Sequence, residues 1–197
     1  MEIVFETLRL CVRRARPDEA DIAFFLRLWN DPQVMRNVGF PFGLRLDAVQ
    51  VRQAVERGLQ LGDERRLDAC LVAVRKDTGQ AIGECRLGTP DGQGLSETDV
   101  KLLPESWGQG YGMEIKRGLL AYLFTHTECL VVQATPNVDN LASIRMQEAV
   151  GGRRVGETTY EFPPEMQSFT CPVRCYVYQV RRDDWLKDNE PGRSGRR

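Results

Sequence analysis

The sequence predicts an α/β protein built on a mixed sheet of about seven strands with helices packed on its faces. Three observations predict this fold class. Seven short runs have the apolar pattern of strands, four longer runs have apolar residues at helical spacing, and the two kinds follow one another along the chain. The resulting order, β, α, α, β, β, β, α, β, α, β, β, is typical of a sheet covered by helices.

The first half of the chain begins with a strand and two helices. Leu8–Arg14 alternates apolar and polar residues, as a half-buried strand does. Asp18 can cap a helix that extends to about Asn30, and the pair Asp31-Pro32 should end it. Asp47–Gly62 has an apolar side at helical spacing and is expected to form the second helix.

The remaining elements begin with a hairpin. Lys76-Asp77-Thr78-Gly79 is a turn signal between two apolar runs, Leu67–Arg75 and Gln80–Leu87. The elements expected after the hairpin are, in order, strand Leu95–Leu103, helix Met113–His126, strand Leu130–Thr135, helix Asn140–Val150, and strands Arg154–Phe162 and Arg174–Arg182.

Length and composition indicate an ordinary globular chain. Its 197 residues suit a single domain over residues 1–186, and Lys187–Arg197 is rich in charge, glycine and proline, which predicts a disordered tail. The net charge of −1 provides no broad basic field, so nucleic acid is not an expected partner. No apolar run approaches the roughly 18 residues of a membrane span, and Met1–Arg14 lacks the apolar core of a signal peptide. We therefore expect a cytoplasmic protein without a membrane partner.

The six cysteines and the single histidine argue against a metal site. The chain has no Cys-x-x-Cys pair, and four of its cysteines lie inside apolar runs, where a reduced cysteine packs as a small apolar side chain. We therefore expect no bound metal.

The most informative stretch is Pro104–Glu114, which lies between a predicted strand and a predicted helix. Its glycines, Gly108, Gly110 and Gly112, allow a tight turn that exposes backbone N–H groups at a helix N-terminus. Such a site favours a phosphate or pyrophosphate. The lysine and hydroxyl of a nucleotide-binding P-loop are missing, because Met113 follows the last glycine. A glycine-rich turn that only caps a helix is the alternative.

A second block lies about 30 residues downstream, and with it the chain resembles the GNAT superfamily of N-acetyltransferases, most closely its RimJ/RimL-like branch. Residues 107–114 are similar to the branch motif Trp-Gly-x-Gly-Tyr-Ala/Gly-x-Glu, and residues 140–151 to the helix motif Asn-x-x-Ser-x-Arg-x-x-Glu-Lys-x-Gly. Three shorter motifs extend the resemblance over roughly residues 6–186: Glu6-Thr7-Leu8-Arg9-Leu10, Trp29-Asn30-Asp31-Pro32 and Arg182-Asp183-Asp184-Trp185.

The resemblance implies the GNAT fold, with a mostly antiparallel sheet, about four helices, and a cofactor in the splay between the fourth and fifth strands. It also implies acetyl-CoA as acetyl donor and a primary amine as acceptor. The family's carbonyl-polarising N–H falls near Leu102 or Leu103. The residues implied for the cofactor are Leu102, Leu103, Trp107, Gly108, Gln109, Gly110, Tyr111, Gly112, Asn140, Ser143 and Arg145.

Several implied roles carry alternatives. Lys116 could add charge at the phosphates or lie on a solvated helical face. Many relatives place a tyrosine acid where this chain has Gln147, so Ser143 is the candidate to hydrogen-bond the departing thiolate. Gly152 replaces the aromatic residue of many relatives, which leaves the local pocket wall uncertain.

The general base is ambiguous among three carboxylates, Glu97, Asp99 and Glu84. Glu97 and Asp99 share one face of their strand, so both could converge on the cleft, and one could then have a raised pKa. Solvent-facing acids are the alternative. No cysteine has a histidine partner, which favours direct transfer in a ternary complex over a covalent intermediate.

Acceptor specificity is expected to come from the first helices, their connection and the loop before the last strand. The candidates are Trp29, Asp31, Phe40, Phe42 and Glu161, with core packing as the alternative for Trp29 and Phe40.

Carboxylates beside aromatic rings suit an amine acceptor such as an aminoglycoside-type antibiotic, with a possible link to antibiotic resistance. The α-amine of a ribosomal protein or other peptide, and a polyamine, remain open. The protein is expected to be a monomer or homodimer. A non-catalytic acyl-CoA-binding regulatory protein is the alternative of a different class.

Overall fold

The computed structural model describes residues 3–61 and 70–189, and within them the chain forms eight strands and six α-helices. The strands are β1 (Ile3–Glu6), β2 (Leu10–Arg14), β3 (Cys70–Arg75), β4 (Ala81–Leu87), β5 (Leu95–Leu102), β6 (Val131–Ala134), β7 (Arg153–Tyr160) and β8 (Val173–Arg181). The helices are α1 (Glu19–Asn30), α2 (Pro32–Met35), α3 (Ala48–Leu61), α4 (Tyr111–His126), α5 (Leu141–Ala149) and α6 (Arg182–Asp188).

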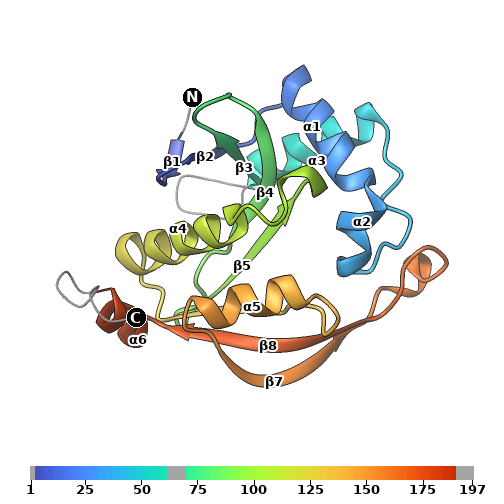
Figure 1. The fold of residues 1–197 in the computed structure, drawn as a ribbon. Helices are drawn as coiled ribbons and strands as arrows, with labels where there is room; N and C mark the ends of the chain where they lie inside the picture. The colour runs from blue at the N-terminus through green and yellow to red at the C-terminus, as the bar shows by residue number, and fades with distance from the viewer. Residues whose placement is uncertain (1–2, 62–69, 190–197) are drawn as a thin grey trace.

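All eight strands belong to one sheet, in the order β1-β2-β3-β4-β5-β6-β8-β7. Among the described strands only β5 and β6 pair in parallel, and the other neighbours are antiparallel. The predicted mixed, mostly antiparallel α/β fold is therefore confirmed. Figure 1 shows the helices α1, α2 and α3 gathered on one side of β4, while α4 crosses the sheet near β5 and α5 lies along β8.

The described structure has two short helices and one strand more than the sequence predicts. β1 is only four residues long, too short for a clear alternation signal, and it is stabilised by antiparallel pairing with β2. At Asp31-Pro32 the first helix does end, but the Asp31 side chain and Pro32 at the first helical position start α2 at once. The third addition, α6, includes Lys187 and Asp188 of the expected tail; residues 190–197 lie outside the described residues. So do Gly62 and residues 67–69 of the expected helix and strand.

The caps predicted from sequence form as the residue types require. Asp18 accepts the N–H of Asp21 at 2.9 Å and starts α1, and Asn140 accepts the N–H of Ser143 at 3.1 Å and starts α5. Gly151, in the left-handed region at φ 84°, follows α5 and ends it.

Two apolar clusters pack on opposite faces of the sheet. On one face the buried side of α4, including Ile115 and Leu119, packs against β2, β3 and β4. On the other face α1 and α3 pack their apolar sides, including Phe25 and Val51, over Val72 of β3. Because β5 is covered by α4 on one side and faces the α1–α2 side on the other, its alternating side chains reach two different environments.

Candidate active site

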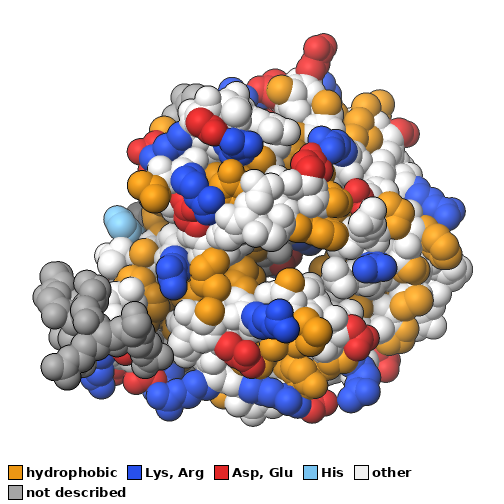
Figure 2. All heavy atoms as spheres, viewed as in Figure 1, with side chains coloured by type: hydrophobic (Ala, Val, Ile, Leu, Met, Phe, Trp, Pro, Cys, Tyr) orange, Lys and Arg blue, Asp and Glu red, His pale blue; other side chains and the backbone are white. Residues whose placement is uncertain are grey.

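The site lies where β5 and β6 diverge. The two strands pair only where Leu95–Glu97 meets Val131–Gln133, after which β5 continues to Leu102 while β6 ends at Ala134. A cavity of about 850 Å³ fills the resulting splay and is lined from β5, α2, α4, α5 and the segment after β6. Figure 2 shows the hollow near the centre of the view. This is the splay predicted between the fourth and fifth strands, which become β5 and β6 because β1 adds one strand.

The glycine-rich loop closes one end of this cavity. Gly108 and Gly110 have φ values of 72° and 80°, which are in the left-handed region that glycine adopts without strain. Gly110 is the N-cap of α4 and has no side chain to bond the first N–H groups of that helix. The Trp107 indole N–H donates to the Leu102 carbonyl at 2.8 Å and ties the loop to the end of β5. The loop therefore offers backbone N–H groups and the positive end of a helix dipole to an anion.

Most residues expected to contact the cofactor do line the cavity. They are Leu102, Trp107, Gly108, Gly110, Gly112, Asn140, Ser143 and Arg145. Leu103, Gln109 and Tyr111 do not. Leu103 is fully buried beside the α1–α3 cluster, and Tyr111 packs under the Arg9 guanidinium at 4.3 Å from its ring centroid. The Gln109 side chain folds back to the Glu105 carbonyl at 2.7 Å.

The register of β4 and β5 determines which backbone N–H groups point into the splay. Gly88 N–H donates to the Glu97 carbonyl, and Leu103 N–H to the Ile82 carbonyl at 3.0 Å, so the odd-numbered residues of β5 bond to β4. The N–H groups of Val100 and Leu102 consequently point away from β4, toward the splay. Of the two positions expected for the carbonyl-polarising N–H, Leu102 has this orientation and Leu103 does not, because its N–H is bonded within the sheet.

Side chains of β5 on the α1–α2 face form a charged network around Lys101. The Lys101 ammonium contacts the Asp99 carboxylate and lies 3.7 Å from Glu84 Oε2. Glu84 also accepts the Trp29 indole N–H at 2.9 Å and the Cys70 thiol at 3.1 Å. Glu84 thus accepts two hydrogen bonds and pairs with Lys101, does not line the cavity, and is held in place by these neighbours.

Asp99 lines the cavity and is the acid whose pKa the network changes. Burial by itself would raise the pKa of Asp99, but the Lys101 ammonium and the Val100 N–H, which donates to Asp99 Oδ1 at 2.8 Å, hold it below the ordinary value. The expectation that convergence of Glu97 and Asp99 raises one pKa is therefore wrong for Asp99, because a lysine and not the second carboxylate is its nearest charged neighbour. Glu97 also lines the cavity and accepts from the Gln133 side chain at 3.2 Å.

On the opposite face of β5, Lys116 of α4 reaches into the cavity wall. Its side chain is only 1% exposed, and its ammonium donates to the Thr98 hydroxyl at 2.6 Å. Burial lowers the pKa of Lys116 to about 8, although the charge of Asp99 acts in the opposite direction. A solvated helical face is therefore wrong for Lys116, which lies on the buried side of α4 at helical spacing from Leu119 and Leu123.

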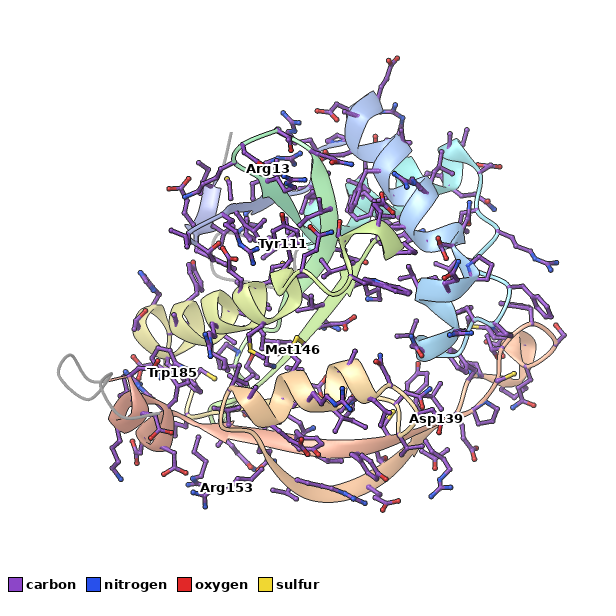
Figure 3. All side chains as sticks on the ribbon, viewed as in Figure 1. Arg13, Tyr111, Asp139, Met146, Arg153 and Trp185 are labelled. Atoms are coloured by element: carbon purple, nitrogen blue, oxygen red, sulfur yellow. The ribbon has the colours of Figure 1, made fainter. Side chains whose placement is uncertain are left out.

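The helix α5 forms the wall opposite α4. Ser143 lines the cavity while its N–H is held by the Asn140 side chain, and Arg145 lines it without an ion pair to any described residue. In Figure 3, Met146 points between α5 and α4, where its sulfur would contact a Cβ at Gly112 at 3.5 Å. Gln147 is buried at the same wall.

Gln147 of α5 and Gly152 just after it, the two positions where the sequence departs from the expected family pattern, are neighbours in space. A Cβ on Gly152 would lie 2.5 Å from the Gln147 carbonyl oxygen, which accepts the Gly152 N–H at 2.8 Å. A side chain at position 152 would therefore clash with the backbone that ends α5, so packing requires glycine here.

The residues expected to bind the acceptor do not line the cavity, and most have structural partners. Trp29 bonds Glu84, and Asp31 caps α2 through the N–H of Gln33 at 2.7 Å. Phe40 packs against Phe162, with ring centroids 5.1 Å apart. Phe42 is 62% exposed beside the Arg45 guanidinium, and Glu161 is exposed beyond the end of β7.

Sequence reasoning missed several polar residues that line the cavity. They are Arg36, Asn37, Arg86, Lys101, Asn137 and Asp139. Lys101 could have been identified from the sequence, because strand alternation places it on the same face as Glu97 and Asp99. The others come from connections between elements or from a neighbouring strand, and only tertiary structure brings them to the cavity.

No three metal-binding side chains of the described residues gather into a site, and no helix among those residues is long and apolar enough to cross a membrane.

Comparison with known proteins identifies the family. The family model for the Acetyltransferase (GNAT) domain matches residues 9–153. The chain is 27% identical over 158 residues to an uncharacterized N-acetyltransferase, p20, from Bacillus licheniformis, covering 79% of this chain and 85% of that protein. The chain therefore belongs to the GNAT acetyltransferase family, and it is an acetyl-CoA-dependent N-acetyltransferase.

Solved structures have the same fold. The spermidine N-acetyltransferase of Vibrio cholerae, in complex with CoA and spermine, superimposes with a TM-score of 0.72 at 16% identity over 90% of this chain and 98% of that one. The aminoglycoside acetyltransferase AAC(6')-Ib, in complex with coenzyme A, gives a TM-score of 0.68 at 18% identity over 92% and 99%. Acetyl-CoA is the acetyl donor of this family, which favours an enzyme over the non-catalytic regulatory alternative.

Proposed function

We propose that the protein transfers the acetyl group of acetyl-CoA directly to a primary amine in a ternary complex, and that the acceptor is a small amine-bearing molecule of the aminoglycoside type. The observation that carries the proposal is the continuous cavity from the glycine-rich loop, through the splay, to the α1–α2 face. A cofactor anchored at the loop and an amine entering from the opposite side can meet at β5 without a covalent intermediate.

The donor occupies the α4–α5 side of the cavity. Its pyrophosphate binds the N–H groups between Gly108 and Gly112, and Arg145 adds a positive charge from α5. Asn140, whose side-chain oxygen caps α5, directs its amide N–H groups to the pantetheine arm. The thioester carbonyl accepts from the Leu102 N–H, a donor fixed by the sheet before charge develops on the oxygen. Ser143 hydrogen-bonds the departing thiolate.

The acceptor enters past Glu97, Asp99 and Asp139, whose carboxylates attract an ammonium group. Since the pKa of Asp99 lies below its ordinary value, its carboxylate is ionised at neutral pH and can hold an ammonium, while the lowered pKa makes it a weak base for removing a proton. Glu84 keeps Lys101 and Trp29 in place and so supports Asp99 indirectly. Two structural neighbours were solved in complex with spermine and with kanamycin, which is consistent with a small polyamine-like or amino-sugar acceptor.

A peptide α-amine is the second candidate. The motif at residues 107–114 resembles the form typical of the RimJ/RimL-like branch, and this resemblance supports a place for the chain in that branch. The charges lining the acceptor side also favour this candidate, because Arg36 and Lys101 lie there beside the carboxylates and could hold a peptide carbonyl or carboxylate.

An assay of thiol release from acetyl-CoA across aminoglycosides, polyamines, free amino acids and ribosomal N-terminal peptides tests the proposal. Turnover with one class names the acceptor, and intersecting initial-rate lines support the ternary complex. Parallel lines would contradict direct transfer. Binding of acetyl-CoA without turnover of any amine would support the proposed binding of the donor but not the proposed transfer to an amine.

Replacing Ser143 by alanine tests the leaving-group role. We expect Ser143→Ala to lower kcat about tenfold, about 1.4 kcal/mol, and to leave the KM for acetyl-CoA within about twofold, because the hydroxyl acts when the thiolate departs. Unchanged kcat would make Ser143 a structural residue. Ala142→Ser, on the same helix and also lining the cavity, is a control for general disturbance of α5.

A further inference from the structure

We propose that Arg9 is a positioning residue for the donor: its guanidinium holds the Gln109 carbonyl on the outside of the glycine-rich loop, so that the Gly110 N–H faces the pyrophosphate. Arg9 is distant from the loop in sequence and belongs to the Glu6–Leu10 motif, to which the proposed function assigns no role. The inference rests on the proposed binding of pyrophosphate at the loop.

The contacts of Arg9 enclose the outer side of the loop. Its NH1 group donates to the Gln109 carbonyl at 3.0 Å, and its Nε donates to Glu114 Oε2 at 2.6 Å. The guanidinium carbon lies 4.3 Å from the centroid of the Tyr111 ring, which fixes the plane of the group. A single side chain therefore bonds a loop carbonyl, a first-turn carboxylate of α4 and the aromatic residue that opens that helix.

The orientation of the Gly110 N–H follows from peptide geometry. The Gln109 carbonyl and the Gly110 N–H belong to the same planar trans peptide and point in opposite directions. When Arg9 holds the carbonyl outward, the N–H must point inward, and Gly110 does line the cavity. The left-handed φ of 80° at Gly110 would allow this peptide to rotate, because glycine has little preference between alternatives. The arginine removes that freedom before the donor binds.

Arg9 also neutralises a carboxylate that would otherwise oppose an anion. Glu114 lies in the first turn of α4, next to the loop. Burial by itself would raise the pKa of Glu114, but the Thr7 hydroxyl, the Arg9 N–H and the Arg9 guanidinium hold it below the ordinary value, so Glu114 is ionised. Without Arg9 this charge would repel the pyrophosphate.

The turn that carries Arg9 is itself held in place by hydrogen bonds. Thr7 accepts the Leu10 N–H at 3.1 Å, and Lys76 donates from its backbone N–H to the Arg9 carbonyl at 3.0 Å and from its ammonium to the Thr7 carbonyl at 2.8 Å. The turn before β2 is thereby held against the loop between β3 and β4.

Calorimetric binding of CoA, dephospho-CoA and pantetheine to Arg9→Met tests the inference without any acceptor. CoA and dephospho-CoA contain the pyrophosphate and pantetheine does not. We expect both nucleotide ligands to bind about tenfold more weakly to the variant, and pantetheine to change by less than about twofold. An equal loss for all three ligands would show a merely structural role and overturn the proposal, as would no loss.

Two further variants keep the result interpretable. Arg75→Met is the matched control, since Arg75 also lies over the Tyr111 ring but forms its hydrogen bonds with Asp77; we expect it to bind all three ligands as the wild type does. Arg9→Lys keeps the charge but cannot bond Glu114 and Gln109 together. We expect it to lose part of the pyrophosphate-dependent affinity, and full affinity would mean that charge alone matters. Failure of wild-type protein to bind CoA would refute the proposed function itself, a different outcome from any of these.

Discussion

The two lysines that line the cavity, one on each face of β5, differ in what compensates their charge. Lys101 lies between Glu84 and Asp99, and these carboxylates raise its pKa despite burial. Lys116 lies across the strand with one hydroxyl partner, Thr98, and burial lowers its pKa to about 8. On the α1–α2 face, the charges of Lys101, Glu84 and Asp99 are paired before any ligand binds. On the α4 face, the two cavity-lining cations Lys116 and Arg145 form no ion pair with a described residue, which would suit the anionic cofactor of the proposed function.

Substitution in the glycine-rich loop should have the largest effect, and it should affect only the binding of the donor. Gly110→Asp forces a β-carbon into the left-handed region at φ 80° and adds a negative charge among N–H groups that would hold the pyrophosphate. We expect CoA binding to weaken more than about 100-fold by calorimetry.

Gly79→Asp provides the control for strain alone. Gly79 has φ 70°, has open space where a Cβ would lie, and belongs to the β3–β4 turn. We expect it to lower the melting temperature without weakening CoA binding. Similar CoA affinities in both aspartate variants would mean that the loop does not hold the phosphates.

The second-largest effect is expected from removing the charge of Lys101 on the α1–α2 face of β5. Lys101→Met leaves Glu84 and Asp99 near one another without their shared cation, and we expect a loss of about 2–3 kcal/mol in the free energy of unfolding at pH 7. Since the pKa of Asp99 is held down by Lys101, this stabilisation is lost as pH falls through that lowered pKa. Urea denaturation should therefore show the difference from wild type shrinking below about pH 4.

A second substitution makes the Lys101 result specific. The double variant Glu84→Gln/Lys101→Met should recover part of the lost stability, because one of the two unpaired carboxylates is then neutral. A double variant less stable than Lys101→Met would show that the pair of carboxylates is not the source of the loss.

Removing the charge of Lys116 should have the smallest of these effects, and it should raise the free energy of unfolding instead of lowering it. Lys116→Met replaces a buried ammonium by an apolar side chain of similar length, and we expect a gain of about 2 kcal/mol in the free energy of unfolding at pH 7. The native pKa of about 8 lies below the ordinary 10.5, so the folded wild type binds fewer protons than the unfolded chain between these values, and its stability rises with pH there.

The pH series is the measurement that decides the Lys116 prediction. The advantage of Lys116→Met should disappear as pH approaches about 10, the ordinary lysine pKa, whereas Arg117→Met, the exposed neighbour on α4, should show no such trend. A Lys116→Met variant less stable than wild type at pH 7 would mean that the Thr98 contact outweighs the burial of charge.

Local sequence signals were enough to predict the glycine-rich end of the cavity. In the proposed function the Gly108–Gly112 loop acts through backbone N–H groups, and glycine spacing next to a helix start is a local signal that needs no distant partner. The caps at Asp18 and Asn140 and the strand alternation that gives Glu97 and Asp99 a common face are local in the same sense. For this reason the fold class, the splay and the cavity-lining part of the loop could be predicted.

The α1–α2 side of the cavity and the support of the loop could not be predicted, because they depend on contacts between elements that are distant in sequence. Aromatic and acidic residues such as Trp29 and Asp31 look like ligand contacts in sequence, but in the structure they lie outside the cavity lining and bond to Glu84 and to the start of α2. Likewise, the short strand β1, the burial of Lys116 and the reach of Arg9 to Gln109 depend on elements that are distant in sequence. The chemistry of a side chain depends on the charges and surfaces that it contacts. In this chain the packing on the two faces of β5 determines those contacts.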